Sequence, residues 1–421
     1  MNVKISKSET KGSVVIPSSK SVAHRVLIAT FLSGGNAEVS GNLKAGDVIA
    51  TFNCLCNLGA KMQINDEKSL ISVNGREEIK TASIDVRDSG STLRFLLPVI
   101  ATLGIKCKVC GTKRLSDRPI GELLSVLAQH GAEFLNHSLP LETGGSITGG
   151  DYVIDAGVSS QFITGLLLAL PVLKSDSRII LKNEMVSSGY VDVTIRVLKK
   201  YGIKIEKTDY GFFVRGGQKY REIKNIAVEG DWSSACFMAC LGAINGEITL
   251  KGLDLNSAQG DKIVVDVLEK IGADVRFDED GSLTVRKSEL NAIKFDAENY
   301  PDIVPVLSAA LAFCNGVSEI SGVERLRLKE SDRISEIIRL HSEFGIKAEY
   351  SDGVLKIYGG KPKACLYRSP DDHRLAMSAA VMASCIQGES KITGAECVNK
   401  SYPDFFDQLK QSGGNVDVQS L

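Results

Sequence analysis

The amino-acid sequence predicts an α/β fold of two similar domains, each built from three repeated units with buried parallel helices and outer sheets. The chain has 421 residues, which is too long for one ordinary hydrophobic core and therefore indicates two domains. A helix-like segment that ends in glycine and is followed by a short alternating run recurs six times. A second, almost wholly apolar segment occurs in every copy.

A glycine near the end of each amphipathic segment marks the repeat. Successive marker glycines are 72, 71, 70, 73 and 68 residues apart, and they are Gly59, Gly131, Gly202, Gly272, Gly345 and Gly413. Apolar side chains between Ile263 and Ile271 recur at the helical period in the fourth copy. Glycine favours a helix end because it adopts the left-handed backbone region without a steric penalty. Each marker glycine is therefore expected to end an outer helix and to precede a strand, such as 274–277.

A second helix in each copy is expected to be buried, because a helix that is apolar on all sides needs a core around it. These six helices should begin near Ser18, Ser89, Ser159, Asp231, Asp302 and Asp371. If they run parallel, their N-termini gather at one end of each domain, where unpaired N–H groups and the helix dipole favour phosphate and carboxylate ligands. Helix capping also explains the Ser and Asp residues, but it does not explain the cations beside them.

The charge and cysteine content restrict the possible partners. Lys and Arg number 50 and Asp and Glu 51, so a formal net charge of -1 gives no global basic field for nucleic acid. The ten cysteines include one C-x-x-C, Cys107 and Cys110, without the second pair of a zinc site, which indicates reduced thiols. We see no targeting segment, and the longest apolar run, Leu166 to Leu173, is too short to cross a bilayer. A cytoplasmic protein without metal, membrane or nucleic-acid partner is expected.

Cationic side chains recur beside the polar starts of the apolar helices and in nearby loops. Eight of them could line one cleft: Lys20, Arg25, Arg94, Arg118, Lys329, Arg333, Arg374 and Lys400. One such cation is ordinarily a solvated surface charge, but repetition at helix starts indicates a common ligand. Arg matches the planar geometry of phosphate and carboxylate, and Lys supplies a mobile point charge. Eight cations favour two polyanions bound together, because a single phosphate needs far fewer.

Eight short motifs follow one another along the chain: S-K-S-V-A-H-R, D-S-G-S-T-L-R, R-P-I-G, V-S-S-Q-F, E-G-D-W-S-S-A, L-K-E-S-D-R, D-D-H-R-L-A-M and K-S-Y-P-D-F-F. Through these motifs, in this order, the chain resembles the EPSP synthase family over essentially its whole length. The resemblance implies two inside-out α/β domains, each of three βαβαββ-type units. It implies domains of 20–228 and of 1–19 plus 229–421, joined by two crossovers, with the active site in the cleft between them.

The resemblance also implies an activity: transfer of the enolpyruvyl group of phosphoenolpyruvate to the 5-hydroxyl of shikimate 3-phosphate, in the pathway to aromatic amino acids. No metal or organic cofactor is implied, and the chain should be a monomer whose partners are these two substrates. Shikimate 3-phosphate would be bound by Lys20, Ser21, Arg25, Ser159, Ser160, Gln161, Ser187, Tyr190, Asp302 and Lys329. Phosphoenolpyruvate, and glyphosate in its place, would be bound by Lys20, Gly90, Arg118, Gln161, Arg333, Arg374 and Lys400.

The implied reaction needs acid–base groups, because the acceptor hydroxyl must lose a proton and the vinyl methylene must gain one. We expect Asp302 to be the base for the hydroxyl and Glu330 the acid for the methylene, with Lys20 sharing in proton transfer. Two plainer interpretations stay open: Asp302 is also a helix N-cap, and Glu330 is a salt-bridged surface residue.

Two positions depart from the family pattern, and two other functions stay open. Asp88 stands where many members have Asn, and Arg325 stands where others have Asn or His. The UDP-N-acetylglucosamine enolpyruvyl transferases share the fold and the donor, but they typically carry a Cys where this chain has Lys113. A non-catalytic anion-binding or RNA-end-processing protein of similar units would not need both acid–base residues, and the balanced charge is against an extended nucleic-acid groove.

Overall fold

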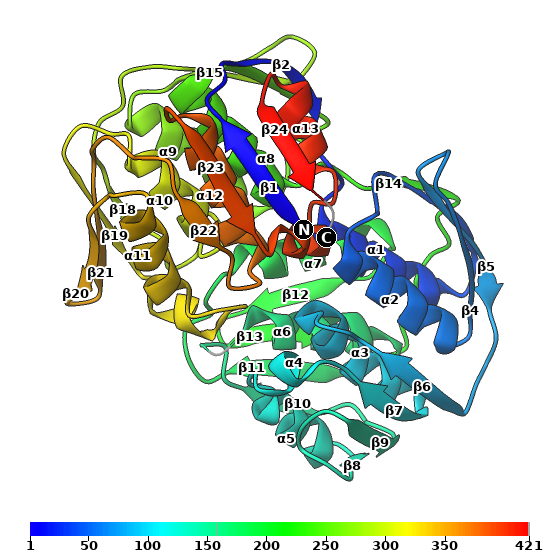
Figure 1. The fold of residues 1–421 in the computed structure, drawn as a ribbon. Helices are drawn as coiled ribbons and strands as arrows, with labels where there is room; N and C mark the ends of the chain where they lie inside the picture. Colours follow the sequence, from blue (N-terminus) through cyan, green and yellow to red (C-terminus); the bar gives the residue numbers. More distant parts are fainter. Residues whose placement is uncertain (158, 420–421) are drawn as a thin grey trace. The chain divides into compact units, whose positions relative to one another are not determined.

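The computed structural model describes residues 1–157 and 159–419, which form two compact units. One is Ser18–Val228, called here the 18–228 unit; the other joins Met1–Pro17 to Glu229–Leu421 and is called the split unit. In the described part of the chain each unit contains three four-stranded sheets and three inner helices (Figure 1). None of the described helices combines the length and the apolar character that crossing a membrane requires.

The sheets of the 18–228 unit have the strand orders β14-β3-β5-β4, β6-β7-β9-β8 and β10-β11-β13-β12. The strands are β3 (Asn36–Ser40), β4 (Ala60–Asn65), β5 (Leu70–Arg76), β6 (Thr81–Asp85), β7 (Lys106–Cys110), β8 (Ala132–Phe134), β9 (Leu141–Gly145), β10 (Asp151–Ile154), β11 (Ser177–Leu181), β12 (Ile205–Thr208), β13 (Gly211–Val214) and β14 (Asn225–Ala227). The inner helices are α1 (Lys20–Ser33), α3 (Gly90–Leu103) and α6 (Ser160–Ala169), and the remaining helical segments are α2 (Gly46–Asn57), α4 (Lys113–Ser116), α5 (Gly121–Gln129), η1 (Leu170–Val172) and α7 (Gly189–Lys200).

The sheets of the split unit have the orders β16-β17-β15-β2, β18-β19-β21-β20 and β22-β23-β1-β24. The strands are β1 (Asn2–Ser6), β2 (Thr10–Val15), β15 (Gly246–Lys251), β16 (Asp274–Phe277), β17 (Leu283–Arg286), β18 (Lys294–Asp296), β19 (Val317–Ser321), β20 (Ala348–Ser351), β21 (Val354–Tyr358), β22 (Leu366–Arg368), β23 (Glu389–Thr393) and β24 (Asn415–Gln419). The inner helices are α8 (Trp232–Asn245), α10 (Val304–Leu311) and α12 (His373–Ser384), and the other helical segments are η2 (Gly260–Ile263), α9 (Val264–Lys270), η3 (Glu324–Leu328), α11 (Arg333–Glu343), η4 (Ala395–Lys400) and α13 (Phe405–Gln411).

The inner helices are buried, as the apolar segments predict. Every residue of α10 and of α12 is buried. Five of the six inner helices have a side-chain cap, in which the hydroxyl or carboxylate accepts a hydrogen bond from a backbone N–H of the first turn: Ser19, Ser89, Ser159, Asp231 and Asp372. The exception is α10, whose N-cap is Ile303 and which has no side-chain cap bond. The interpretation of Asp302 as an N-cap is therefore wrong, and its carboxylate is available for other contacts.

The marker glycines lie where the repeat predicts them. The outer helices α2, α5, α7, α9, α11 and α13 each end two residues before their marker glycine. All six glycines have a positive φ, between 73° and 109°, which a side chain with a Cβ rarely adopts. The glycine requirement therefore comes from the backbone turn between each outer helix and the strand after it.

Three strands pair away from their neighbours in the chain. β2 runs into α1 but pairs in parallel with β15 of the split unit, and β14 runs into α8 but pairs in parallel with β3 of the 18–228 unit. The N-terminal strand β1 lies between β23 and β24 and pairs antiparallel with both, so that the two termini meet in one sheet (Figure 1). The split unit is thus completed by two strands, β1 and β2, from outside its main run of sequence, whereas β14 closes the continuous 18–228 unit.

Candidate active site

In the 18–228 unit, the first two turns of α1 carry two predicted cations with different surroundings. Nζ of Lys20 lies 2.9 Å from the carboxylate of Asp47 in the first turn of α2. Arg25, one turn further on, is 2% exposed, and its Nε donates to the hydroxyl of Thr194 at 2.7 Å. Its Nη1 donates to the carbonyl of Ser21 at 2.6 Å, and its Nη2 to the carbonyl of Tyr190 at 2.9 Å. Burial lowers the pKa of Arg25 to about 9.

The predicted donor-binding residues of this unit come together at the starts of α3 and α6. Nη1 of Arg94 donates to Oε1 of Gln161 at 2.6 Å, and Nε2 of Gln161 donates to the hydroxyl of Ser91 at 2.9 Å. A Cβ placed on Gly90 would lie 3.0 Å from Nη1 of Arg118 and 3.1 Å from Nη1 of Arg94. Nε of Arg118 is buried and has no hydrogen-bond partner among the described residues. The guanidinium groups of Arg94 and Arg118 therefore both approach Gly90, where the absence of a side chain leaves room for them.

The predicted acceptor-binding residues of the third repeat lie at two helix starts. Ser159 caps α6, Ser160 is its first residue, and Val158, which opens the V-S-S-Q-F motif, lies outside the described residues. Ser187 is 2% exposed and has φ 53°, a left-handed conformation that is unusual for a residue other than glycine. Tyr190 lies in the first turn of α7. A strained backbone at such a position is typical of a functional site.

In the split unit, one buried guanidinium holds three carboxylates. Arg333 is 0% exposed; its Nε lies 2.8 Å from Asp372, its Nη1 3.1 Å from Asp302, and its Nη2 2.7 Å from Glu330. Burial lowers the pKa of Arg333, but these three carboxylates together raise it above its ordinary value. Arg333 thus brings together the two residues that the sequence proposes as base and acid.

Further cations surround the same two carboxylates. Nζ of Lys329 lies 3.5 Å from the carboxylate of Asp302, and Nη1 of Arg374 donates to the backbone carbonyl of Asp302 at 2.8 Å. Nζ of Lys400 lies 3.9 Å from the carboxylate of Glu330. Burial lowers the pKa of Lys329, while the charge of Asp302 opposes this shift. Glu330 is salt-bridged, as its plainer interpretation holds, and its side chain is only 12% exposed.

Three carboxylates of these clusters were missed by the sequence analysis. Asp47 and Asp372 follow ordinary helix-start patterns, so only their three-dimensional partners distinguish them from capping or first-turn acids. Asp261 is buried, and it accepts a hydrogen bond from the hydroxyl of Ser233 at the start of α8. Burial, followed by the charge of Asp302, raises the pKa of Asp261 to about 6. A Gln-Gly-Asp turn directly before an amphipathic helix is the only sequence signal that could have indicated it.

The two departures from the family pattern have identifiable surroundings. The carboxylate of Asp88 lies 3.2 Å from Arg114 and accepts a hydrogen bond from the hydroxyl of Thr112 at 3.0 Å. Its extra negative charge, compared with Asn, is therefore compensated by a neighbouring cation. Arg325 lies in η3, and its charge adds to the burial that lowers the pKa of Lys329.

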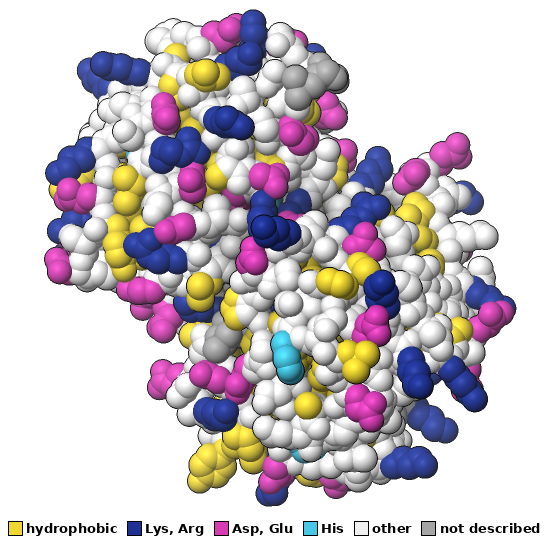
Figure 2. Space-filling model, turned by 60° about the horizontal axis from the view of Figure 1, so that its bottom comes forward, with side chains coloured by type: hydrophobic (Ala, Val, Ile, Leu, Met, Phe, Trp, Pro, Cys, Tyr) yellow, Lys and Arg dark blue, Asp and Glu magenta, His cyan; other side chains and the backbone are white. Residues whose placement is uncertain are grey.

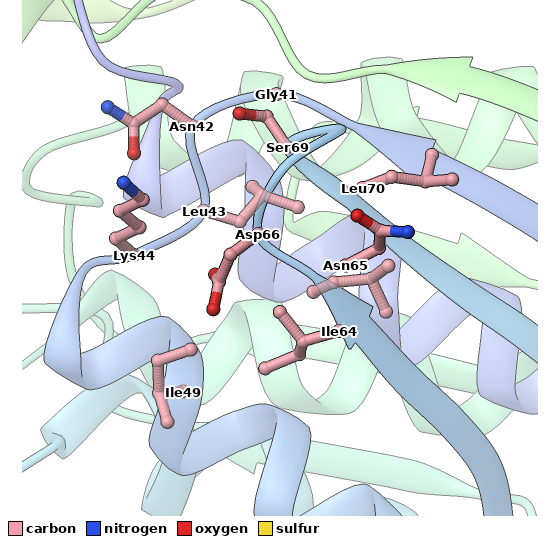
Figure 3. A pocket seen from close by; sticks show the side chains of 11 residues that line it. Gly41, Asn42, Leu43, Lys44, Ile49, Ile64, Asn65, Asp66, Ser69 and Leu70 are labelled. Atoms are coloured by element: carbon pink, nitrogen blue, oxygen red, sulfur yellow. The ribbon is translucent and has the colours of Figure 1, made fainter.

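One surface pocket is distinct from these clusters. It lies between the loop 41–44, the side chain of Ile49 and the hairpin of β4 and β5 (Figure 3). None of the predicted site residues lines it. On the face drawn in Figure 2, basic and acidic side chains are intermixed rather than separated into large patches of one sign.

Solved structures share this architecture. An EPSP synthase of Acinetobacter baumannii superposes with a TM-score of 0.85 at 23% identity, covering 100% of each chain. The enolpyruvyl transferase NikO of Streptomyces tendae gives a TM-score of 0.79 at 15% identity, covering 99% of this chain and 98% of its own. The fold is therefore that of the enolpyruvyl transferases.

Sequence comparisons identify one family within this fold. The family model of EPSP synthase (3-phosphoshikimate 1-carboxyvinyltransferase) matches residues 5–409. A 3-phosphoshikimate 1-carboxyvinyltransferase of Clostridium perfringens is 37% identical over 97% of this chain and 98% of its own length, and one of Clostridium kluyveri is 36% identical over 100% and 99%. The chain belongs to the EPSP synthase family.

Proposed function

We propose that the chain transfers the enolpyruvyl group of phosphoenolpyruvate to the 5-hydroxyl of shikimate 3-phosphate, releasing phosphate. Membership of the family and the names of its close relatives support this activity. The observation that carries it is the position of Arg333, which holds Asp302 and Glu330 within one buried ion cluster. Two carboxylates in one cluster can exchange protons with two different atoms of the substrates, as an addition–elimination reaction requires.

The two units supply different kinds of charge. Among the candidate residues of the 18–228 unit, four cations, Lys20, Arg25, Arg94 and Arg118, accompany one carboxylate, Asp47. Helix N-termini at the same place add unpaired N–H groups that favour anions. We propose that this unit binds the phosphate of the acceptor and part of the donor, and that residues of both units contribute to one site in a cleft between them. The full residue sets are those that the family resemblance implies.

In the proposed mechanism, Asp302 accepts the proton of the 5-hydroxyl as its oxygen attacks C2 of phosphoenolpyruvate. Glu330 donates a proton to C3, so that the methylene becomes a methyl group and a tetrahedral intermediate forms. Glu330, now ionised, takes a proton back from this methyl group, and phosphate departs with the proton held by Asp302, which restores the double bond and both carboxyl groups. Lys20 and the guanidinium groups stabilise the phosphate and carboxylate charges throughout. These steps need only groups of the chain and the substrates.

The test is the release of phosphate from phosphoenolpyruvate, measured with shikimate 3-phosphate or UDP-N-acetylglucosamine as the acceptor. We expect release with shikimate 3-phosphate and background with the nucleotide sugar, because the residue where the second family typically has Cys is Lys113, the first residue of α4. Release with the nucleotide sugar alone would support the rival transferase, and release with neither would support a binding protein. We further propose that the protein acts as a monomer in the cytoplasm.

A further inference from the structure

Three helices of the 18–228 unit are joined by a line of buried polar side chains that none of the proposed substrate contacts uses. Nδ1 of His24 in α1 lies 2.7 Å from the hydroxyl of Thr51 in α2. The Thr51 hydroxyl lies 2.7 Å from that of Thr92 in α3, which donates to the hydroxyl of Ser89 at 2.7 Å. All four residues are 0% exposed. A connected polar chain in an otherwise apolar interior restricts how its helices can shift against one another.

One end of this chain and a branch at Thr92 lie beside proposed substrate contacts. Ser89 is the N-cap of α3, and the next residue is Gly90. The hydroxyl of Thr92 also lies 3.4 Å from the backbone carbonyl of Asp47, whose carboxylate holds Lys20. The line of hydroxyl groups therefore connects the residue that orients Lys20 with the turn over which Arg94 and Arg118 meet.

The protonation state of His24 determines in which direction the hydrogen bonds of this line of side chains run. Burial, with the charges of Lys20 and Arg25, lowers the pKa of His24 well below its ordinary value, so the ring is neutral. Its Nε2 is buried and has no hydrogen-bond partner among the described residues. A bare nitrogen is the less costly unpaired group, because orphaned buried N–H groups are rare in proteins. His24 then carries its proton on Nδ1 and donates to Thr51, which donates to Thr92. The single hydroxyl proton of Thr92 is shared between the hydroxyl of Ser89 at 2.7 Å and, more weakly, the carbonyl of Asp47 at 3.4 Å.

We propose that His24, Thr51 and Thr92 are positioning residues that fix Lys20 and the Ser89–Gly90 turn relative to each other, and thereby set the affinity for phosphoenolpyruvate. This inference rests on the proposed function of the same site. Shikimate 3-phosphate depends less on this line of hydrogen-bonded side chains, called here the relay, because Arg25 and the start of α7 are joined by separate hydrogen bonds. Loss of the relay should therefore affect the donor more than the acceptor.

The test compares Thr51→Val, which keeps the shape but removes the hydroxyl group, with Thr51→Ser, which keeps the hydroxyl group. Thr30→Val is the matched control: Thr30 is a buried threonine of α1 whose hydroxyl lies 2.6 Å from that of Tyr201, outside the relay. We would measure the melting temperature, kcat and the two KM values for each. Thr51→Val should raise the KM for phosphoenolpyruvate about tenfold and that for shikimate 3-phosphate less than threefold, whereas Thr51→Ser and Thr30→Val should stay within twofold of wild type.

The outcomes separate the inference from the function on which it rests. An unchanged donor KM in Thr51→Val, an equal rise in Thr30→Val, or a rise in Thr51→Ser as large as in Thr51→Val would each overturn the relay while leaving the activity established. A wild-type protein without turnover would overturn the proposed function and the inference with it. A loss of melting temperature shared by Thr51→Val and Thr30→Val, with a donor effect in Thr51→Val alone, would support the relay.

Discussion

Substitution of Gly90 by alanine tests the donor site most directly. Gly90 is the first residue of α3 and is not among the glycines with positive φ, so alanine fits the backbone. The alternative that glycine is required here only for its backbone angle is therefore wrong. The added Cβ would lie 3.0 Å from Nη1 of Arg118 and 3.1 Å from Nη1 of Arg94. These distances are roughly half an ångström below an ordinary contact of about 3.5 Å.

The size of the effect on the KM depends on how far the added Cβ displaces the two guanidinium groups. Overpacking costs roughly 1–3 kcal/mol, and the low end applies because the atoms met are the ends of flexible side chains. A displacement of the two guanidinium groups worth about 1 kcal/mol corresponds to about a fivefold higher KM for phosphoenolpyruvate. Glyphosate is longer than the donor, so it should tolerate the narrowed site less, with an inhibition constant raised at least about tenfold more than the donor KM.

The assay is steady-state phosphate release with glyphosate as the competitor, together with a thermal melt. Gly121→Ala is the matched control, because Gly121 is the first residue of α5 and an added Cβ there meets no described atom within 4 Å. We expect Gly121→Ala to leave both ligands unchanged and both variants to melt near wild type. Equal losses for donor and glyphosate, or a lowered melting temperature for Gly90→Ala alone, would refute the steric reasoning.

Two further predictions concern the split unit. Asp302→Asn and Glu330→Gln should each lower kcat at least about a hundredfold, with shikimate 3-phosphate still bound by Glu330→Gln in calorimetry; near-normal turnover of both would remove their assigned roles. Because the pKa of Asp261 rises from 3.8 to about 6 on folding, its stabilising contribution is present below about pH 4 and is lost as the pH rises through 6. Asp261→Asn should therefore lose less stability than wild type between pH 4 and 7 in denaturant titrations, and parallel curves would contradict this.

The repeat was predictable because its signals are local. A positive φ at Gly272 or Gly413 and an apolar run such as α10 are dictated by a few neighbouring residues. The fold class followed from counting such signals, and the family match agrees with it. The patterns do not show that β2 pairs in a sheet of the split unit and β14 in a sheet of the 18–228 unit. Each of these strands is followed in the chain by a helix of the other unit.

The candidate site was predicted as a set of cations with the carboxylates Asp302 and Glu330, but three further carboxylates of these clusters were not predicted. Asp372 precedes His373 in a motif that reads as a helix cap, and it does cap α12, yet its carboxylate also holds Arg333, which is 39 residues away in the chain. Asp47 and Lys20 are likewise on different helices. Pairings of this kind depend on how helices pack, and no spacing within one element signals them.

The carboxylates are distributed differently in the two units. Arg333, Lys329 and Arg374 all lie within 3.5 Å of the carboxylate of Asp302, so that its charge is paired with three cations. An anionic ligand that pairs with Lys329 or Arg374 therefore competes with Asp302 for these cations. The 18–228 unit lacks such a balance among its candidate residues, because only Asp47 opposes four cations. The candidate cations of the split unit are therefore largely paired with carboxylates of the same unit, whereas those of the 18–228 unit keep an excess of positive charge that favours an anionic ligand.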